Sequence, residues 1–368
     1  MTEIKIKSIQ DFINSLPETK HGGYTRFFRG HSDKTYDTEP SIYRKNKETG
    51  KKELIKGEHL IIRDVLTECA EYFSPHDTFF DKLVRMQHYG YPTRLLDVSY
   101  SALVGLYFAV NQNNGINQRN IQCKDCQVDN IIDDDLKDGE VIIFDIPNDT
   151  LKYHDSDTVA ILSALSLQNN DFNLNEISTI SKYFSKREQA LYLKNEKDIA
   201  EFLESDRGRR DLYDEMQNLV YEIGKLPDSE RDKIINPIIT ETFNNQEHIV
   251  RLLNDVRNDK PYFLPIINRH DLEKVILVKP RANNPRIVRQ QGAFLIFGIQ
   301  ESKEEQAIMD ENWIATKEKR LIIDAQSKQG ILEQLSSFGI SHQTLFPELD
   351  SQARYIIERH KDKSTKNK

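Results

Sequence analysis

Residues 79–110 read FFDKLVRMQHYGYPTRLLDVSYSALVGLYFAV, and two helices are predicted within this stretch. The first covers Phe79–Tyr89, because its apolar side chains recur at helical spacing and a glycine and a proline follow at the positions of a helix stop. The second is the apolar segment Ala102–Ala109, whose N-terminus Ser99 or Ser101 can cap. The polar residues between the two helices are therefore held in a short turn, where side chains suited to chemistry are concentrated.

This turn is one of four polar clusters in the sequence, and its reactive members are His88, Tyr89, Thr93, Arg94, Asp97 and Ser99. The N-terminus of an apolar helix that opens to a cleft is a ready site for an anion. We expect these side chains to surround such an anion. The alternative is that Arg94 and Asp97 form a structural ion pair that holds the turn.

Another cluster is Arg26–His31, at the end of the predicted strand Tyr24–Gly30. Arg29 in this position can clamp a phosphate bidentately, and Gly30 lets the backbone approach a ligand. The alternative is a surface arginine beside a turn glycine.

The two remaining clusters lie late in the chain. Arg286–Phe294 is predicted to begin a strand, with Arg289 and Gln291 on one face and Gln290 on the other. Amides at a strand edge can hydrogen-bond a ribose or a base, or can simply cap the edge of a sheet. Gly339–Asp350 is predicted to be a structural connector between helices.

Composition limits the class of protein. The chain has 368 residues and a net charge of −8, which argues against a general nucleic-acid coat but leaves a local basic site open. Three cysteines exclude a disulfide framework, and no apolar run approaches the roughly 18 residues of a membrane span. We therefore expect a cytoplasmic protein without a membrane partner. Cys123 and Cys126 lack two further soft ligands nearby, so no metal site is predicted.

Changes in amino-acid composition and in the spacing of apolar residues divide the chain into four segments. Residues 1–174 are predicted to form the N-terminal part of the core, with a polar insertion at 111–135. Residues 175–260 are predicted to be a helical insertion or subdomain, and residues 261–355 the C-terminal part of the core. Residues 356–368 form a basic tail that we expect to be disordered. Because strands come early, helices in the middle and strands late, the fold class is α+β.

The order of these clusters resembles the FRG domain family, named for the tripeptide Phe28-Arg29-Gly30. The other matching segments are His88–Gly90, Pro92–Asp97, Leu106–Ala109, Arg286–Phe294 and Thr344–Pro347. The resemblance extends from about residue 20 to 355. It implies a bacterial or phage-borne protein, because the members of this family are mainly of that origin, and some of them look like parts of antiphage or toxin systems.

The motif order also looks like that of ADP-ribosyltransferases of the arginine–serine–glutamate type. This likeness implies that Arg29 holds the phosphate of NAD and that Ser99 or Thr93 lies beside the nicotinamide ribose. It gives Gln291 the late-strand position of the glutamate. Because an amide cannot stabilise a developing positive charge as a carboxylate does, Asp97 is the candidate for that role. A split, mostly antiparallel sheet with flanking helices and a large helical insertion would bring these segments together.

Three functions follow from these observations. The first is an NAD-dependent ADP-ribosyltransferase or glycohydrolase that acts as a defence effector on a protein or nucleic-acid target. Its catalytic residues would be Asp97, Ser99 and Gln291, and its cofactor would be bound by Arg29, Gly30, His88, Tyr89, Thr93, Arg94, Arg286, Arg289 and Gln290. The second is a non-catalytic module that senses a nucleotide or nucleic acid. The third, a phosphodiester hydrolase using His88 and Asp97, is disfavoured because no paired carboxylates have metal spacing. The first two require that distant arginines converge on one cavity that fits a pyrophosphate.

Overall fold

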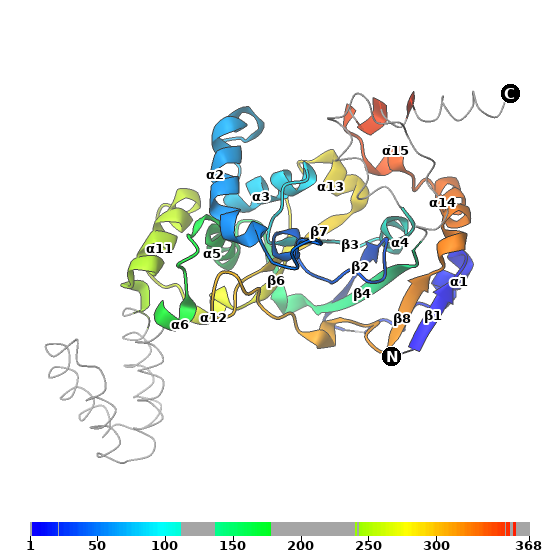
Figure 1. The fold of residues 1–368 in the computed structure, drawn as a ribbon, viewed down its shortest axis with the longest axis horizontal. Helices are drawn as coiled ribbons and strands as arrows, with labels where there is room; N and C mark the ends of the chain where they lie inside the picture. The colour runs from blue at the N-terminus through cyan, green and yellow to red at the C-terminus, as the bar shows by residue number, and fades with distance from the viewer. Residues whose placement is uncertain are drawn as a thin grey trace, which may run out of the picture.

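The computed structural model describes residues 2–20, 22–111, 137–177, 240, 243–349, 351–353 and 356–357. Its strands form one eight-stranded sheet in the order β1-β8-β4-β2-β3-β7-β6-β5 (Figure 1). Neighbouring strands run antiparallel except in the pairs β1–β8 and β5–β6. The expected α+β class and mostly antiparallel sheet are confirmed.

The strands are β1 (Thr2–Ile6), β2 (Tyr24–His31), β3 (Leu95–Ser99), β4 (Gly139–Pro147), β5 (Leu151–Tyr153), β6 (Val275–Lys279), β7 (Gly292–Phe297) and β8 (Lys319–Ile323). The α-helices are α1 (Ile9–Asn14), α2 (Glu58–Glu68), α3 (Phe79–His88), α4 (Ala102–Val110), α5 (Asp157–Ala164), α6 (Leu174–Ile177), α11 (Glu247–Asp259), α12 (Arg269–Leu272), α13 (Pro285–Gln290), α14 (Lys328–Ser337) and α15 (His342–Leu345).

The sheet is split between β2 and β3. β2 pairs with β4 along its whole length, but its register with β3 consists of the single pair Phe28 and Ser99. On one face, a first helix cluster of α2, α3, α5 and α11 packs on β3, β7 and β6. A second cluster of α1, α4 and α14 packs on β1, β8, β4 and β2. Figure 1 shows these two groups of helices at opposite ends of the sheet. The boundary between the two clusters follows the split.

Local sequence signals explain the helices that flank the split. Thr78 accepts a hydrogen bond from the Asp81 N–H and Asp81 reciprocates, which forms a capping box at the start of α3. Gly90 follows α3 with a φ of 87°, as the predicted helix stop requires. Ser101, one of the two predicted caps, accepts from the Val104 N–H at the start of α4. The turn between α3 and α4 contains β3, which places Asp97 on a strand inside the sheet.

Gly30 has a packing role. A Cβ atom at this position would lie 2.1 Å from the carbonyl oxygen of Gly105 in α4. The backbones of β2 and α4 can approach this closely because neither residue has a side chain. The close approach at Gly30 is therefore to a helix, where the sequence suggested a ligand.

The strand predicted from Arg286 onward is wrong in its first part. Residues Pro285–Gln290 form the helix α13, in which Asn284 accepts from the Arg286 N–H as the N-cap. Gln291 ends the helix in the left-handed conformation with a φ of 48°, and β7 begins one residue later. An Asn-Pro start signal for a helix outweighs the weak alternation of the following residues. Gln291 consequently does not occupy a late-strand position.

Parts of the chain lie outside the described residues. They include most of the polar insertion at 111–135, with Cys123 and Cys126, most of the predicted helical insertion at 175–260, and nearly all of the tail at 356–368. The four-segment division stays a prediction, although strands from 1–174 and from 261–355 share the one sheet. In the described part of the chain, no helix combines the length and the apolar character that a membrane span requires.

Arg94 is completely buried and does not pair with Asp97. Its Nε donates to Oε1 of Glu58 at 3.0 Å, its Nη2 donates to Oε2 of the same carboxylate, and its Nη1 donates to the carbonyl oxygen of Phe297 at 3.3 Å. The Nζ of Lys303 lies 3.3 Å from Glu58 Oε2, also with no exposed side-chain surface. This buried ionic network joins α2, the start of β3 and the loop after β7. Arg94 is a structural residue with no surface open to a ligand.

We expect Glu58→Gln to lower the free energy of unfolding by about 3–5 kcal/mol, because it leaves two buried cations without a counter-charge. Urea unfolding followed by circular dichroism measures this loss. The matched control is Glu311→Gln, which removes an exposed carboxylate beside Lys317 and should change stability by less than about 1 kcal/mol. Equal stability of the two variants would contradict the structural role of the network.

Candidate functional site

The candidate site lies at the split and is centred on Asp97. This carboxylate is 55 % exposed although β3 lies between β2 and β7 inside the sheet. Arg29 reaches across from β2, and its Nη1 donates to the backbone carbonyl of Asp97 at 2.6 Å. The same Nη1 lies 3.9 Å from Oδ2 of the Asp97 carboxylate. Two residues that the sequence assigned to one site therefore meet in space.

The Asp97 carboxylate is oriented by a chain of hydrogen bonds. Gln87, in the last turn of α3, donates through Nε2 to Asp97 Oδ2 at 2.5 Å. The hydroxyl of Thr93 donates to Gln87 Oε1 and so fixes which end of the amide faces the carboxylate. Thr93 is itself held by Ser41, whose Oγ accepts from the Thr93 N–H at 3.1 Å. Thr93 is thus a positioning residue that acts through Gln87.

Arg29 is a largely but not fully buried cation, 12 % exposed, with incomplete charge compensation. Its Nε donates to Nε2 of His31 at 3.0 Å, and no described residue accepts a hydrogen bond from its Nη2. Burial lowers the pKa of Arg29 to about 10; Asp97 opposes this shift and the nearby Arg44 adds to it. A site with this excess of positive charge favours an anionic ligand.

His88, at the end of α3, is joined to α13 by two contacts. The amide of Asn284 lies 2.9 Å from Nδ1 of His88, and Nη1 of Arg286 donates to the His88 carbonyl at 3.1 Å. Burial, followed by the charge of Arg286, lowers the pKa of His88 to about 4, while Asp97 acts in the opposite direction. The imidazole is therefore neutral at neutral pH and can accept or donate one hydrogen bond without adding charge.

The residues of α13 hold the C-terminal part of the fold. The guanidinium of Arg286 lies 4.6 Å from the centre of the Phe346 ring. Nη1 of Arg289 donates to the Thr344 carbonyl and Nε2 of Gln290 donates to the Leu345 carbonyl, both at 3.2 Å. The donors predicted to bind a ligand at Arg289 and Gln290 thus anchor α15.

The structure separates the predicted site residues into two groups. Those on or near Asp97 are Arg29, Thr93, which acts through Gln87, and His88, while Arg286 contacts the His88 carbonyl and the Phe346 ring. Those engaged elsewhere are Gly30, Arg94, Arg289 and Gln290, described above, together with Ser99 and Gln291. The hydroxyl of Ser99 donates to the Gln290 carbonyl at 2.7 Å, and Gln291 lies in the turn before β7. Tyr89 is 62 % exposed, with its ring packed edge-on against Tyr72.

Three residues that contribute to the site were not among those predicted from the sequence: Gln87, Asn284 and His31. Each has a local signal that could have found it. Gln87 lies one residue before His88, Asn284 precedes a proline as a helix cap does, and His31 is two residues from Arg29 on the same face of β2.

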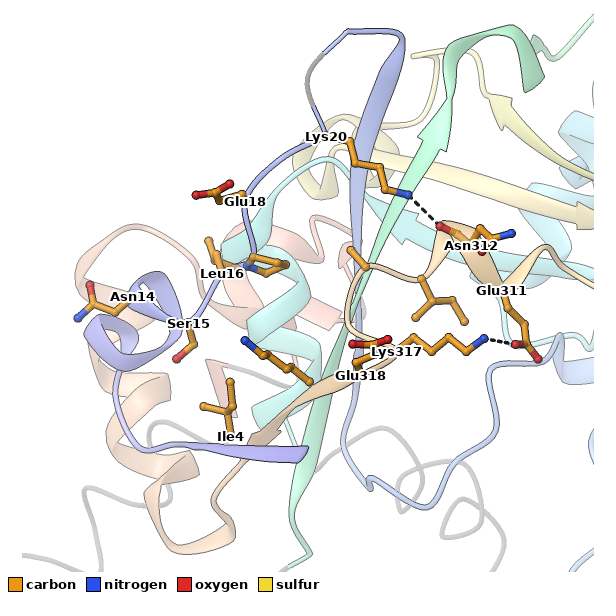
Figure 2. A pocket seen from close by; sticks show the side chains of 14 residues that line it. Ile4, Asn14, Ser15, Leu16, Glu18, Lys20, Glu311, Asn312, Lys317 and Glu318 are labelled. Carbon is orange, nitrogen blue, oxygen red and sulfur yellow. Dashed lines mark hydrogen bonds and ion pairs between the residues drawn. The ribbon is translucent and has the colours of Figure 1, made fainter. Parts of the chain in front are cut away.

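Two cavities lie away from Asp97. One, of about 680 Å³, opens between residues 14–20 and the segment 311–319, where Lys20 donates to the Asn312 carbonyl (Figure 2). The other, of about 460 Å³, lies between Arg63 and α11. Neither includes Arg29, Asp97 or Arg286. Within the described ranges, no three His, Cys, Asp or Glu side chains are grouped as a metal site would require.

The low pKa values of two histidines predict a loss of stability in acid. Burial, with the charge of Arg29, lowers the pKa of His31 to about 3, and that of His88 is about 4. Between pH ~6.5 and ~4 the unfolded chain therefore binds protons that the folded chain does not, so stability falls as the pH falls. His31→Gln keeps an acceptor for Arg29 and does not titrate, so its melting temperature should fall less than that of the wild type over this range.

Thermal unfolding in a pH series measures this difference. The control is His270→Gln, because His270 is largely exposed and its loss should leave the acid-side slope unchanged. A His31→Gln variant with the full wild-type slope would show that His31 is not a buried neutral group.

Comparison with known proteins gives one match. Residues 25–118 match the model of the FRG domain. This segment contains Arg29, His88, Thr93 and Asp97, whereas Arg286 lies beyond it, so the match covers the first part of the span that the motif order suggested. Searches among curated proteins and among solved structures gave no match.

Proposed function

We propose that the Asp97 site of this FRG-domain chain binds a phosphate-containing nucleotide. The observation that supports this most strongly is the state of Arg29, a partly exposed guanidinium whose Nη2 lacks a partner among the described residues. The carboxylate of Asp97, at 3.9 Å, is its nearest ion-pair partner, while Arg44 adds further positive charge. A phosphate oxygen at Nη2 would complete the hydrogen bonding of Arg29 and neutralise this excess.

The adjacent side chains suit the rest of a nucleotide. Tyr89 directly follows His88 and presents an exposed ring, and aromatic rings stack on nucleobases whatever their sequence. His88 is neutral and can hydrogen-bond a ribose hydroxyl. In the proposed complex, His88 would serve the ribose and Tyr89 the base.

The reaction that we propose is cleavage of the bond between nicotinamide and ribose in NAD. Positive charge develops on the ribose carbon as this bond breaks, and a carboxylate beside it lowers the barrier. Asp97 is exposed to an incoming ligand and is held in place by Gln87 and Thr93. Water as the acceptor gives a glycohydrolase and a target side chain gives ADP-ribosyl transfer. Either activity would suit an antiphage or toxin-type effector.

One observation favours the alternative of a non-catalytic nucleotide or nucleic-acid sensor. The transferase resemblance placed Ser99 at the ribose and Gln291 at the late-strand position of the glutamate, but Ser99 donates to a carbonyl of α13 and Gln291 lies in the terminal turn of that helix. Of the three positions in that motif order, Gln291 departs from the expected place, since it lies in the turn before β7, and Asp97 would supply the carboxylate. A sensor requires the phosphate contacts of Arg29 and no carboxylate chemistry.

Asp97→Asn separates these functions, because it removes the negative charge but keeps the shape of the side chain and the contact with Gln87. If the protein cleaves NAD, we expect nicotinamide release to fall at least ~100-fold while NAD binding changes less than ~5-fold. Nicotinamide is measured by chromatography, and NAD binding by calorimetry. The control is Asp64→Asn, an exposed acid of α2 that should keep wild-type activity.

Arg29→Lys tests the phosphate contact itself. Lysine keeps the charge but loses the planar donor fork, so we expect the affinity for NAD, ADP-ribose and AMP to fall about ten-fold or more. Binding of these nucleotides by the wild type without nicotinamide release would support the sensor. Absence of binding to all three, in the folded protein, would contradict a nucleotide site at Asp97.

A further inference from the structure

The outer edge of β1 presents unpaired backbone groups. β1 is the first strand of the sheet, and its neighbour is β8, with which it runs parallel (Figure 1). The Thr2 N–H donates to the Glu318 carbonyl at 2.8 Å, and the Ile6 carbonyl accepts from the Asp324 N–H at 3.0 Å. Thr2 and Ile6 therefore direct their backbone groups toward β8.

Backbone direction alternates along a strand, so Ile4 also bonds to β8 whereas Glu3 and Lys5 direct both their N–H and C=O groups away from it. No described residue forms a hydrogen bond with these four outward groups. The two residues are also accessible, since their side chains are 41 % and 52 % exposed. The edge thus offers two donors and two acceptors to an extended segment.

The two faces of this strand differ. Glu3 and Lys5 lie on one face, and Ile4 and Ile6 lie on the other, where Ile6 is buried and Ile4 lines the cavity of Figure 2. A strand that pairs with this edge must therefore place an apolar side chain opposite Ile4 and charges opposite Glu3 and Lys5.

We propose that β1 pairs antiparallel with β1 of a second copy of this chain. With Ile4 opposite Ile4 of the second copy, Glu3 lies opposite Lys5 of the second copy, and the reverse pair forms by symmetry. Both are hydrogen-bonded positions, so the two pairs exchange four backbone hydrogen bonds and carry opposite charges on one face. The arrangement is a two-fold, self-complementary contact.

The charges of Glu3 and Lys5 favour this strand register over the registers shifted by two residues. A shift of two residues in either direction keeps the faces matched but places Glu3 opposite Glu3 of the second copy, or Lys5 opposite Lys5 of the second copy. Like charges directly opposite each other destabilise a strand pair.

Five residues on each side bury less than the roughly 1,200 Å² of a stable interface, so the dimer is weak and forms at high protein concentration.

Each charge also has partners within its own chain. Glu3 lies 3.3 Å from Nζ of Lys34 and 3.5 Å from Nη1 of Arg320, and Lys5 lies 3.7 Å from Asp138 and 3.6 Å from Asp324. Pairs of this length at the surface contribute little. They do, however, dictate the design of the test, which must separate loss of these contacts from loss of the contact between copies.

Exchanging the charges of Glu3 and Lys5 separates the loss of contacts within the chain from the loss of contacts between copies. Sedimentation equilibrium from about 10 µM to about 1 mM should show a reversible monomer–dimer equilibrium for the wild type. Glu3→Lys and Lys5→Glu each place like charges opposite each other between copies, so each should raise the dissociation constant at least ~10-fold. The double variant Glu3→Lys/Lys5→Glu restores opposite charges between copies but not within the chain, so its dissociation constant should return to within ~3-fold of the wild type.

Two further variants complete the experiment. Lys5→Pro removes an outward N–H and leaves the bonds of β1 to β8 intact, so it should also weaken the dimer at least ~10-fold with little change in melting temperature. Lys319→Glu is the matched control, because it makes the same charge change on β8, a strand whose two edges are both occupied. A wild type that stays monomeric throughout, or a double variant no tighter than the single ones, would overturn the proposal.

Discussion

The contact between Arg94 and Glu58 in the core is the constraint on which the rest of the site depends. Glu58 begins α2, Arg94 precedes β3, and Lys303 comes from the loop after β7, so one buried carboxylate fixes three segments that are distant in sequence. Because Thr93 is the neighbour of Arg94, its hydroxyl is placed where it orients Gln87, and Gln87 in turn holds Asp97. A buried ionic network is a weak source of net stability, but it defines geometry well once all its partners are in place.

The split in the sheet explains how a strand in its interior can expose a carboxylate. A single continuous layer of helices would bury Asp97, and a buried carboxylate without a full set of partners is costly. Here the helices form two separate clusters, and the strand between them is left accessible at their boundary. The single pair between Phe28 and Ser99 keeps β2 and β3 in one sheet while Arg29 occupies the opening. The same feature that divides the core therefore creates the site.

Local signals in the sequence were sufficient for the helices that flank the split and for the class of fold, but they did not identify α13 or the partners of buried charges. The capping residues and the stop at Gly90 predicted α3 because these interactions are formed by residues a few positions apart. The partner of Arg94 is 36 residues away and could not be distinguished from the nearby Asp97, since both are carboxylates. β1 was missed because its charged residues interrupt the apolar pattern, and its place in the sheet depends on β8, more than 300 residues later. The contact between Arg29 and Asp97 agrees with one part of the predicted site, whereas the convergence of the arginines on one cavity stays a prediction.

Four arginines of the predicted site differ in the partners that their guanidinium groups contact. Arg94 satisfies its donors with a carboxylate and a carbonyl in the core, and Arg289 donates to a carbonyl of α15. Arg286 lies on the ring of Phe346 and donates to the His88 carbonyl. Arg29 is partly exposed, and its protein partners are a neutral imidazole, a carbonyl and one distant carboxylate. This incompletely paired cation is the group to which we propose that a nucleotide phosphate binds.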